Sequence, residues 1–300
     1  MKHVTVLLKE SIKGLNIKED GLYVDATLGG AGHSELILSY LDKGHLYAFD
    51  QDEYALEVAS KRLDKYNNKT LIYDNFANMK TRLNALGVEK VDGILADLGM
   101  SSFQIDDETR GFTYLKDTSL DMRMNQKSDL TAAHILNTYS YEELANVFYL
   151  YGDEENSFKI ASQIIKNRPL KTTFDLVNIC DKVNYKRKGH SAKKVFQALR
   201  IVVNDEIKVL EKLLKDSLEL LNEGGRLVVI TFHSLEDRIV KHFMKEHSSV
   251  NIPKNVIIFD EMLAPLKLIT RKPILPTKEE LTDNSRSRSA KLRIAEKNKD

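Results

Sequence analysis

The residues with the clearest chemical potential form a glycine-rich loop that follows an acidic residue. The stretch YVDATLGGAGHSE spans residues 23–35, and it places three glycines shortly after Asp25. Glycines let a backbone approach a ligand closely, so the loop is a candidate ligand cradle around Gly30 and Gly32. A phosphate-binding P-loop requires a lysine and then Ser or Thr directly after the last glycine. Residues 33 and 34 are His and Ser, which excludes that class of site.

Two cofactor classes remain for this loop. GGAGHS fits the dinucleotide pattern G-x-G-x-x-G only loosely. S-adenosylmethionine has no phosphate, and Asp25 suits it because a carboxylate attracts an ammonium group and repels a pyrophosphate. Asp50 ends the second expected strand, where a carboxylate takes ribose hydroxyls of either cofactor. Phe76 ends the third expected strand, where it either packs on adenine or belongs to the core.

A second cluster of candidate residues follows the fourth expected strand, in ADLGMSSFQ (residues 96–104). Transfer of a group to an amine requires acceptors for the amine's N–H protons, which leaves the nitrogen lone pair to attack. Asp97 offers a side-chain acceptor and Leu98 or Gly99 a main-chain carbonyl. The alternative is an Asp that ends a strand and caps a turn. His233, in TFHSLED, either contacts a target nucleotide or fixes its own loop by hydrogen bonding.

The formal net charge of +1 conceals two basic stretches, residues 184–194 with five basic residues and no acid, and residues 285–293 with four. They are candidate polyanion contacts, and solvated surface is the alternative. The candidates are Lys186, Arg187, Lys188, Lys193, Lys194, Arg286 and Arg288. Arg123, between two methionines in LDMRM, is either an RNA contact or part of an internal ion pair. No spacing of His, Cys, Asp and Glu predicts a metal site.

Composition favours a globular protein of the cytoplasm. The 300 residues include 42% hydrophobic residues and one cysteine, Cys180, which cannot form an intramolecular disulfide. The apolar run near the N-terminus covers only residues 4–8, too short for a signal peptide or a membrane span. We therefore expect no membrane partner and no export.

Short apolar runs alternate with helical periods from residue 22 onward, which predicts an α/β fold with a doubly wound, mainly parallel sheet. Strands are expected at residues 22–27, 45–50, 70–76, 91–98, 226–232 and 289–297. The long gap before the fifth strand predicts an insertion. We expect a helical RNA-binding subdomain at 106–204, inserted in a cofactor domain at 1–105 and 205–300. Turn-rich residues 264–288 are expected to form a loop.

Several blocks of the sequence resemble the signatures of the ribosomal RNA small-subunit methyltransferase H family, the bacterial cytosine-N4 methyltransferases of 16S ribosomal RNA. They include DATLGGAGHS, DLGMSSFQID, FQALRIVVN, ITFHSLEDRIVK and NSRSRSAKLRIAE, and the series extends in order from His3 to Glu296. The resemblance implies a seven-stranded Rossmann-like methyltransferase sheet and S-adenosylmethionine as cofactor. It implies cofactor contacts from Ala31, Gly32, His33, Asp50, Phe76, Asp97 and Gln104.

The sequence thus predicts methyl transfer to the exocyclic amine of a cytidine in the decoding region of 16S ribosomal RNA. Asp97, Gly99 and His233 are the expected catalytic residues. Two alternatives stay open: a non-catalytic ribosome-assembly factor that binds RNA and the cofactor, and an NAD-linked oxidoreductase. The sequence also leaves open whether the substrate is naked RNA or the small ribosomal subunit, and whether the chain is a monomer or a homodimer.

Overall fold

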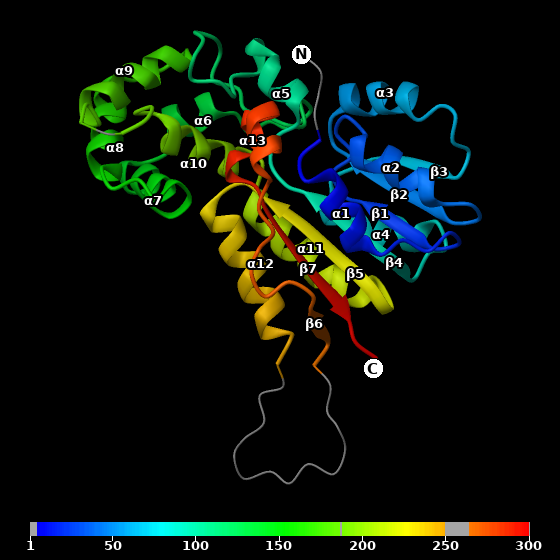
Figure 1. The fold of residues 1–300 in the computed structure, drawn as a ribbon. Coiled ribbons are helices and arrows are strands. Elements are labelled where there is room, and N and C mark those ends of the chain that lie inside the picture. Colours follow the sequence, from blue (N-terminus) through cyan, green and yellow to red (C-terminus); the bar gives the residue numbers. More distant parts are fainter. Residues whose placement is uncertain (1–4, 187, 250–263, 300) are drawn as a thin grey trace, which may run out of the picture. The chain divides into compact units, whose positions relative to one another are not determined.

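A computed structural model describes residues 5–186, 188–249 and 264–299. The chain forms two compact units, shown in Figure 1. The sheet unit comprises Met1–Gly99 and Val209–Asp300, and the helical unit comprises Met100–Lys208. The expected division at residues 105 and 204 lies a few residues away from these limits.

The sheet unit is built on seven strands in the order β3-β2-β1-β4-β5-β7-β6. The strands are β1 (Leu22–Asp25), β2 (His45–Asp50), β3 (Lys69–Tyr73), β4 (Val91–Asp97), β5 (Leu221–Thr231), β6 (Leu266–Leu268) and β7 (Lys291–Lys297). The first five are mutually parallel, and β7 runs antiparallel to both β5 and β6. The predicted doubly wound, mainly parallel sheet is confirmed. Because the order reverses between β1 and β4, the carboxyl ends of these strands are where a ligand crevice is expected.

Helices cover both faces of the sheet because its strands are apolar on both sides. Successive residues of one strand enter different cores: Val228 packs with one cluster and Val229 with the other. The first cluster includes side chains of α1 (Leu8–Leu15), α2 (Gly32–Tyr40) and α3 (Glu53–Arg62). The second includes side chains of α4 (Met79–Ala85), α11 (Glu206–Leu220) and α12 (Ser234–Glu246). These two layers fix the strand ends from which the candidate residues extend.

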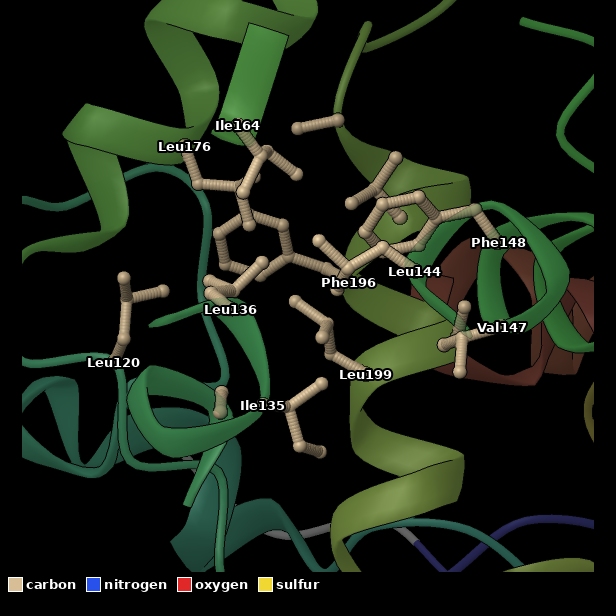
Figure 2. Packing of buried hydrophobic residues seen from close by; sticks show 14 of the residues in the cluster. Leu120, Ile135, Leu136, Leu144, Val147, Phe148, Ile164, Leu176, Phe196 and Leu199 are labelled. Atoms are coloured by element: carbon tan, nitrogen blue, oxygen red, sulfur yellow. The ribbon is translucent and has the colours of Figure 1, made fainter. Parts of the chain in front are cut away.

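The helical unit has its own apolar core (Figure 2), in which Phe148, Ile164 and Leu199 are fully buried. Its main helices are α6 (Ala132–Thr138), α7 (Tyr141–Gly152), α8 (Ser157–Lys166), α9 (Thr173–Val183) and α10 (Lys193–Val203). The short helices α5 (Ser102–Asp106) and η2 (Glu108–Arg110) precede them. Ser140 and Glu143 form a capping box at the start of α7. The insertion is therefore a folded unit rather than a long loop.

The expectation of a continuous loop over residues 264–288 is wrong. This segment contains β6, α13 (Lys278–Asp283) and the start of η3 (Ser285–Ser289). Strand β6 has only three residues and is defined by its pairing with β7, a non-local contact that local composition does not reveal. The N-cap residue of helix α13 is Thr277, whose hydroxyl accepts a hydrogen bond from Glu280 N at 3.2 Å. The spacing of Thr277 and Glu280 is a helix-capping signal, although the nearby prolines favour a loop.

Candidate active site

Asp25 at the end of β1 organises the loop that follows it. Its Oδ1 accepts a hydrogen bond from Thr27 N at 3.0 Å, and its Oδ2 accepts one from the Ser34 hydroxyl at 2.6 Å. The residue is 1% exposed, and this burial raises the pKa of its carboxyl although both hydrogen bonds act to lower it. Asp25 therefore ties β1 to the first turn of α2 and places a buried acid beneath the loop.

Asp50 at the end of β2 holds the loop from the neighbouring strand. Its Oδ2 accepts from Gly29 N at 2.9 Å, and its Oδ1 accepts from Asp52 N at 2.9 Å. Burial raises the pKa of this carboxyl to about 6, against the effect of the two backbone hydrogen bonds. Each oxygen of a carboxylate has two acceptor positions, so Asp50 retains acceptor capacity for a ligand hydroxyl.

The tip of the loop has an unusual backbone. Ala31 has a φ of +60°, in the left-handed region that favours glycine, and it directly precedes α2. A side chain at Gly32 would meet the Thr5 hydroxyl, since a Cβ there would lie 1.8 Å from Thr5 Oγ1. His33 follows in the first turn of α2 and is 4% exposed. The predicted loop residues 30–33 thus form one tightly defined turn at a helix N-terminus.

Arg62, at the end of α3, is a residue of this site that sequence reasoning missed. Its Nη1 donates to the carbonyl oxygen of Gly30 at 2.7 Å, while its Nε donates to Glu35 Oε2 at 2.9 Å. Burying or orienting a carbonyl needs a donor, and Arg62 supplies it from a different helix. The only local signal was an arginine in the last turn of an expected helix, which is common on any surface.

Asp97 ends β4 beside the same loop. Its backbone N–H donates to the Thr27 hydroxyl at 2.6 Å, and Nδ1 of His33 lies 3.7 Å from its Oδ2. Its Oδ1 is buried, and no hydrogen-bond partner for this atom exists among the described residues. Burial, reinforced by the charges of Asp25 and Glu236, raises the pKa of the Asp97 carboxyl well above its usual value. A buried acceptor without a partner is costly in a folded protein, and a ligand donor would relieve that cost.

Gly99 lies two residues beyond Asp97. Leu98 N still bonds to the Ile230 carbonyl at 3.0 Å, and the backbone then turns at Gly99, whose φ is +102°. A side chain is strained at that angle, so glycine allows the chain to leave the sheet immediately after the strand. The main-chain carbonyls of Leu98 and Gly99, the two candidate acceptors, therefore directly follow Asp97 in the chain.

His233 is the N-cap residue of α12. Its Nδ1 accepts from Glu236 N at 3.3 Å, and Glu236 Oε2 accepts from His233 N at 3.2 Å. The Nε2 atom lies 3.0 Å from Glu236 Oε1, without the alignment of a hydrogen bond. These contacts support the loop-fixing interpretation of His233, and they account for Glu236 as part of a capping box.

Asp237 belongs to a separate support behind this helix start. Its Oδ1 accepts from Arg293 Nε at 2.7 Å, and its Oδ2 accepts from Lys291 Nζ at 3.1 Å. Burial alone would raise the pKa of Asp237, but these two cations outweigh it and the pKa is lowered. Asp237 is thus an ionised residue that joins α12 to β7, which indicates a structural role.

Acids dominate the electrostatics at the ends of β1, β2 and β4. The pKa values of Asp25, Asp50 and Asp97 are all raised, and in each case burial is the main cause. Asp25 adds to the shift at both other residues, which shows that the three charges interact. Such a site repels a pyrophosphate and favours a cationic ligand. The sulfonium and ammonium groups of S-adenosylmethionine fit these acidic side chains, and the phosphates of a dinucleotide do not.

Two predicted cofactor residues lie in other surroundings. Phe76 is the first residue of η1 (Phe76–Asn78), partly buried against the apolar core of the sheet unit. Gln104 belongs to the helical unit, where it forms a capping box with Ser101 at the start of α5 and is 4% exposed. Their roles toward the cofactor stay predictions.

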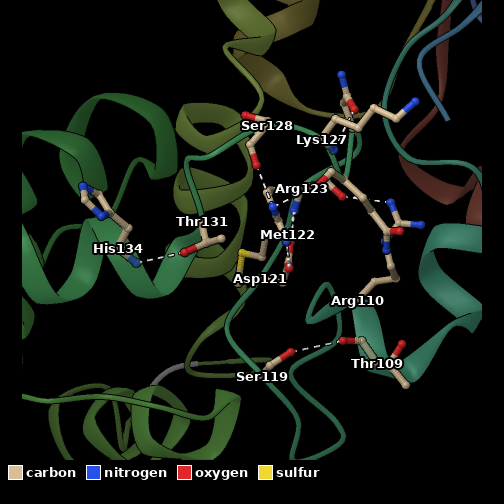
Figure 3. A network of polar contacts seen from close by, with 12 residues as sticks. Thr109, Arg110, Ser119, Asp121, Met122, Arg123, Lys127, Ser128, Thr131 and His134 are labelled. Carbon is tan, nitrogen blue, oxygen red and sulfur yellow. Dashed lines mark hydrogen bonds and ion pairs between the residues drawn. The ribbon is translucent and has the colours of Figure 1, made fainter. Parts of the chain in front are cut away.

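The predicted RNA contacts divide by their surroundings. Arg123 makes a two-point ion pair with Asp121, at 2.9 and 2.7 Å, and its Nη1 donates to the carbonyls of Gln126 and Ser128, as Figure 3 shows in part. These contacts favour the internal ion pair. Lys186, Lys188, Lys193, Arg286 and Arg288 are exposed, and Lys194 donates to the carbonyl of Asp153. Arg187 lies outside the described residues.

Comparison with known proteins assigns the chain to a family. A family model described as the MraW methylase family matches residues 1–298. Ribosomal RNA small subunit methyltransferase H 1 of Acholeplasma laidlawii is 63% identical over 99% of both chains. Ribosomal RNA small subunit methyltransferase H of Onion yellows phytoplasma is 51% identical, over 99% of this chain and 97% of that protein.

Among solved structures, an rRNA methylase from Streptococcus thermophilus aligns with a TM-score of 0.44 and 15% identity over 99% of both chains. Within the described residues, no helix is both long and apolar enough to cross a bilayer. The match of the family model over nearly the whole length, together with relatives of this identity, is decisive. The chain belongs to the MraW methylase family.

Proposed function

We propose that this chain transfers a methyl group from S-adenosylmethionine to the N4 amine of a cytidine in the decoding region of 16S ribosomal RNA. The observation that carries the proposal is the buried Asp97 carboxyl, whose Oδ1 has no partner among the described residues. It stands next to the glycine-rich loop and the acids Asp25 and Asp50, a set that suits a cationic cofactor. Family membership and two relatives named as ribosomal RNA small subunit methyltransferases support the RNA substrate.

The sheet unit has the groups that cofactor binding requires. Asp50 accepts the ribose hydroxyls with the acceptor positions that Gly29 and Asp52 leave open. Asp25 and the loop of residues 30–33 surround the amino-acid end of the cofactor, where the negative potential of Asp25 attracts the ammonium group. Phe76 packs on the adenine. When bound, the cofactor supplies a methyl group already activated for transfer.

The chain's own part in the reaction is to orient the amine and accept its proton. An exocyclic cytosine amine shares its lone pair with the ring, so acceptors for both N–H bonds are needed to direct that lone pair toward the methyl. Asp97 and the carbonyl of Leu98 or Gly99 are these acceptors. A raised pKa makes the Asp97 carboxylate a better base for the departing proton. The target base has to leave its helix or loop to reach them.

The helical unit is proposed to hold the RNA backbone. No acidic residue lies within residues 184–194, the stretch that contains the exposed Lys186, Lys188 and Lys193. Phosphate contacts position the nucleic acid without reading its sequence. Replacing Lys186, Arg187 and Lys188 by Ala should weaken binding of any RNA and reduce the salt dependence by up to about one log–log unit per lost contact. Parallel salt slopes for native and triple-variant protein would remove these residues from the interface.

The test of the proposed reaction is single-turnover methylation. Purified small ribosomal subunits and naked 16S RNA from cells that lack the gene are incubated with enzyme and radiolabelled S-adenosylmethionine, and mass spectrometry locates the product. Asp97→Ala should slow transfer by roughly 100-fold or more, the scale of a lost acid–base residue. Retention of near-native turnover in Asp97→Ala would overturn the mechanism. Label appearing on one of the two substrates alone identifies the form on which the enzyme acts.

The alternatives make different predictions in the same experiment. A ribosome-assembly factor without catalysis would bind RNA and cofactor but leave the label on the cofactor. An oxidoreductase would bind NAD, and calorimetric titration with NAD and with S-adenosylmethionine separates the two cofactors. The acids at the strand ends favour S-adenosylmethionine, because each carboxylate repels a pyrophosphate.

A further inference from the structure

The loop after α9 exposes an aromatic ring to an unusual degree. Tyr185 is 75% exposed, the highest fraction among the large hydrophobic side chains of the described residues. It directly follows Asn184, the C-cap residue of α9. The fold buries little of this ring, which leaves it accessible to a ligand.

The residue before Tyr185 is held firmly. Asn184 is 5% exposed, and its Nδ2 donates to the Ser191 carbonyl at 3.0 Å and to Glu154 Oε2 at 3.3 Å. Its Oδ1 accepts from Asn156 Nδ2 at 2.9 Å. The contact with Ser191 closes the base of the loop, because residues 184 and 191 flank it.

The residues after the loop are also fixed. Ser191 donates to an oxygen of Asp181 on α9. The ring of His190 lies against Tyr114, with centroids 4.2 Å apart, and Tyr114 meets Phe196 edge-on at 5.6 Å. Tyr185 therefore directly follows an anchored residue, Asn184, and the chain is anchored again at His190 and Ser191.

A positive charge accompanies the ring. Lys186 Nζ lies over one face of the Tyr185 ring, 5.4 Å from its centroid, so a base would stack on the opposite face; Lys188 is exposed in the same loop. An exposed aromatic face beside ammonium groups is the combination that single-stranded nucleic-acid sites use, with the base on the ring and the phosphate on the cation. Folded double-stranded RNA offers no free base face, so the fitting ligand is an unpaired segment.

We propose that Tyr185 stacks an unpaired nucleobase of the RNA substrate, with Lys186 binding an adjacent phosphate. The inference rests on the proposed function for its RNA substrate, and it adds a base-stacking contact away from the methylated nucleotide. Loss of one stacked base lowers single-strand affinity by roughly 5- to 150-fold. Tyr185→Phe keeps the stacking face, so it should retain nearly native affinity, whereas Tyr185→Ala should not.

The sequence contains no tryptophan, which allows a direct spectroscopic test. Tyr185→Trp introduces one indole as the only tryptophan of the chain. Its fluorescence should be quenched by single-stranded oligocytidylate and not by an abasic ribose-phosphate oligomer of equal length and charge. Tyr149→Trp is the matched control, since Tyr149 is 60% exposed on α7 without a neighbouring basic run. It should respond to neither oligomer.

Three results would overturn the inference: equal quenching by the abasic oligomer, equal quenching of the Tyr149→Trp control, or native oligocytidylate affinity in Tyr185→Ala. A blue shift of Tyr185→Trp emission with phosphatidylglycerol vesicles, in place of quenching by oligocytidylate, would assign the loop to a membrane surface and also overturn it. Methyl transfer by the native protein is measured separately on small subunits. If the native protein methylates RNA while the stacking tests fail, only this inference falls. If stacking is observed and no methyl is transferred, only the proposed function falls.

Discussion

Asp50 should make S-adenosylmethionine affinity depend on pH in a defined window. Burial raises the pKa of its carboxyl to about 6, and the ribose hydroxyls donate to the ionised form. Below pH 6 the free protein therefore has to lose a proton before the cofactor binds well. Above that pH no proton needs to be displaced. The affinity should thus decrease as the pH falls through 6, and the pKa of the complex should lie below that of the free protein.

The size of the effect follows from this pKa. At pH 7 about nine-tenths of the Asp50 carboxyls are ionised, and at pH 5 about one-tenth are, by the ordinary titration curve for a pKa of about 6. If the cofactor binds the ionised form alone, affinity should fall by about tenfold between these pH values, or about 1.4 kcal/mol. The amino and carboxyl groups of the cofactor change little in charge over this range.

Calorimetry between pH 5 and 7, on native protein and Asp50→Asn, is the appropriate assay. Asp50→Asn should bind about 1–3 kcal/mol more weakly at pH 7, since a charge-assisted hydrogen bond is lost. Its affinity should lose most of the pH dependence. Asp25 and Asp97, whose pKa values are also raised, are present in both proteins, so the pH dependence that Asp50→Asn loses is the part that depends on the Asp50 carboxylate. The same slope in both proteins would show that Asp50 is not the titrating group at the cofactor site.

Three further changes probe the parts that hold this site. Arg62→Gln removes the donor to the Gly30 carbonyl and should weaken cofactor binding by about 1 kcal/mol in calorimetry, with little change in the melting temperature; native affinity would show that the contact is dispensable. Gly32→Ala should reduce cofactor affinity because its Cβ would meet Thr5, and Thr5→Gly in the same protein should restore it, failing which the clash is not the cause.

Asp237→Ala leaves the buried Arg293 without its partner, so chemical denaturation should show a loss of about 3–5 kcal/mol near pH 7. The lowered pKa of Asp237 means that its stabilisation is present above the unfolded value of 3.8 and is lost as the pH falls through the folded value. The difference between native and variant protein should therefore shrink below pH 4, and a constant difference would contradict the ion-pair account.

Local patterns predicted the parallel strands of the sheet and the acids at their ends. Asp25, Asp50 and Asp97 each end a strand whose apolar run is legible in the sequence, and parallel strands of a doubly wound sheet bring such ends to one edge. The pattern determined which residues gather but not how each is used. Asp25 and Asp50 both accept backbone N–H groups of the loop, so part of their acceptor capacity serves the loop itself.

The elements that sequence reasoning missed depend on partners far away in the chain. Strand β6 exists through β7, and the Gly30 carbonyl is held by an arginine on α3. Neither partner alters the local composition, so neither leaves a periodic signal. His233 shows the intermediate case: a histidine followed three residues later by Glu fits a capping box, but the same residue type suits a nucleotide contact equally well.

The capping box of His233 and Glu236 at the start of α12 affects the pKa of Asp97. Glu236 accepts from both Phe232 N and His233 N, so its charge is fixed at the helix start, where the positive end of the helix dipole stabilises it. From that position it contributes to the raised pKa of Asp97. The His233–Glu236 capping pair thus places one of the charges that raise the pKa of Asp97, the carboxyl proposed to accept the amine proton.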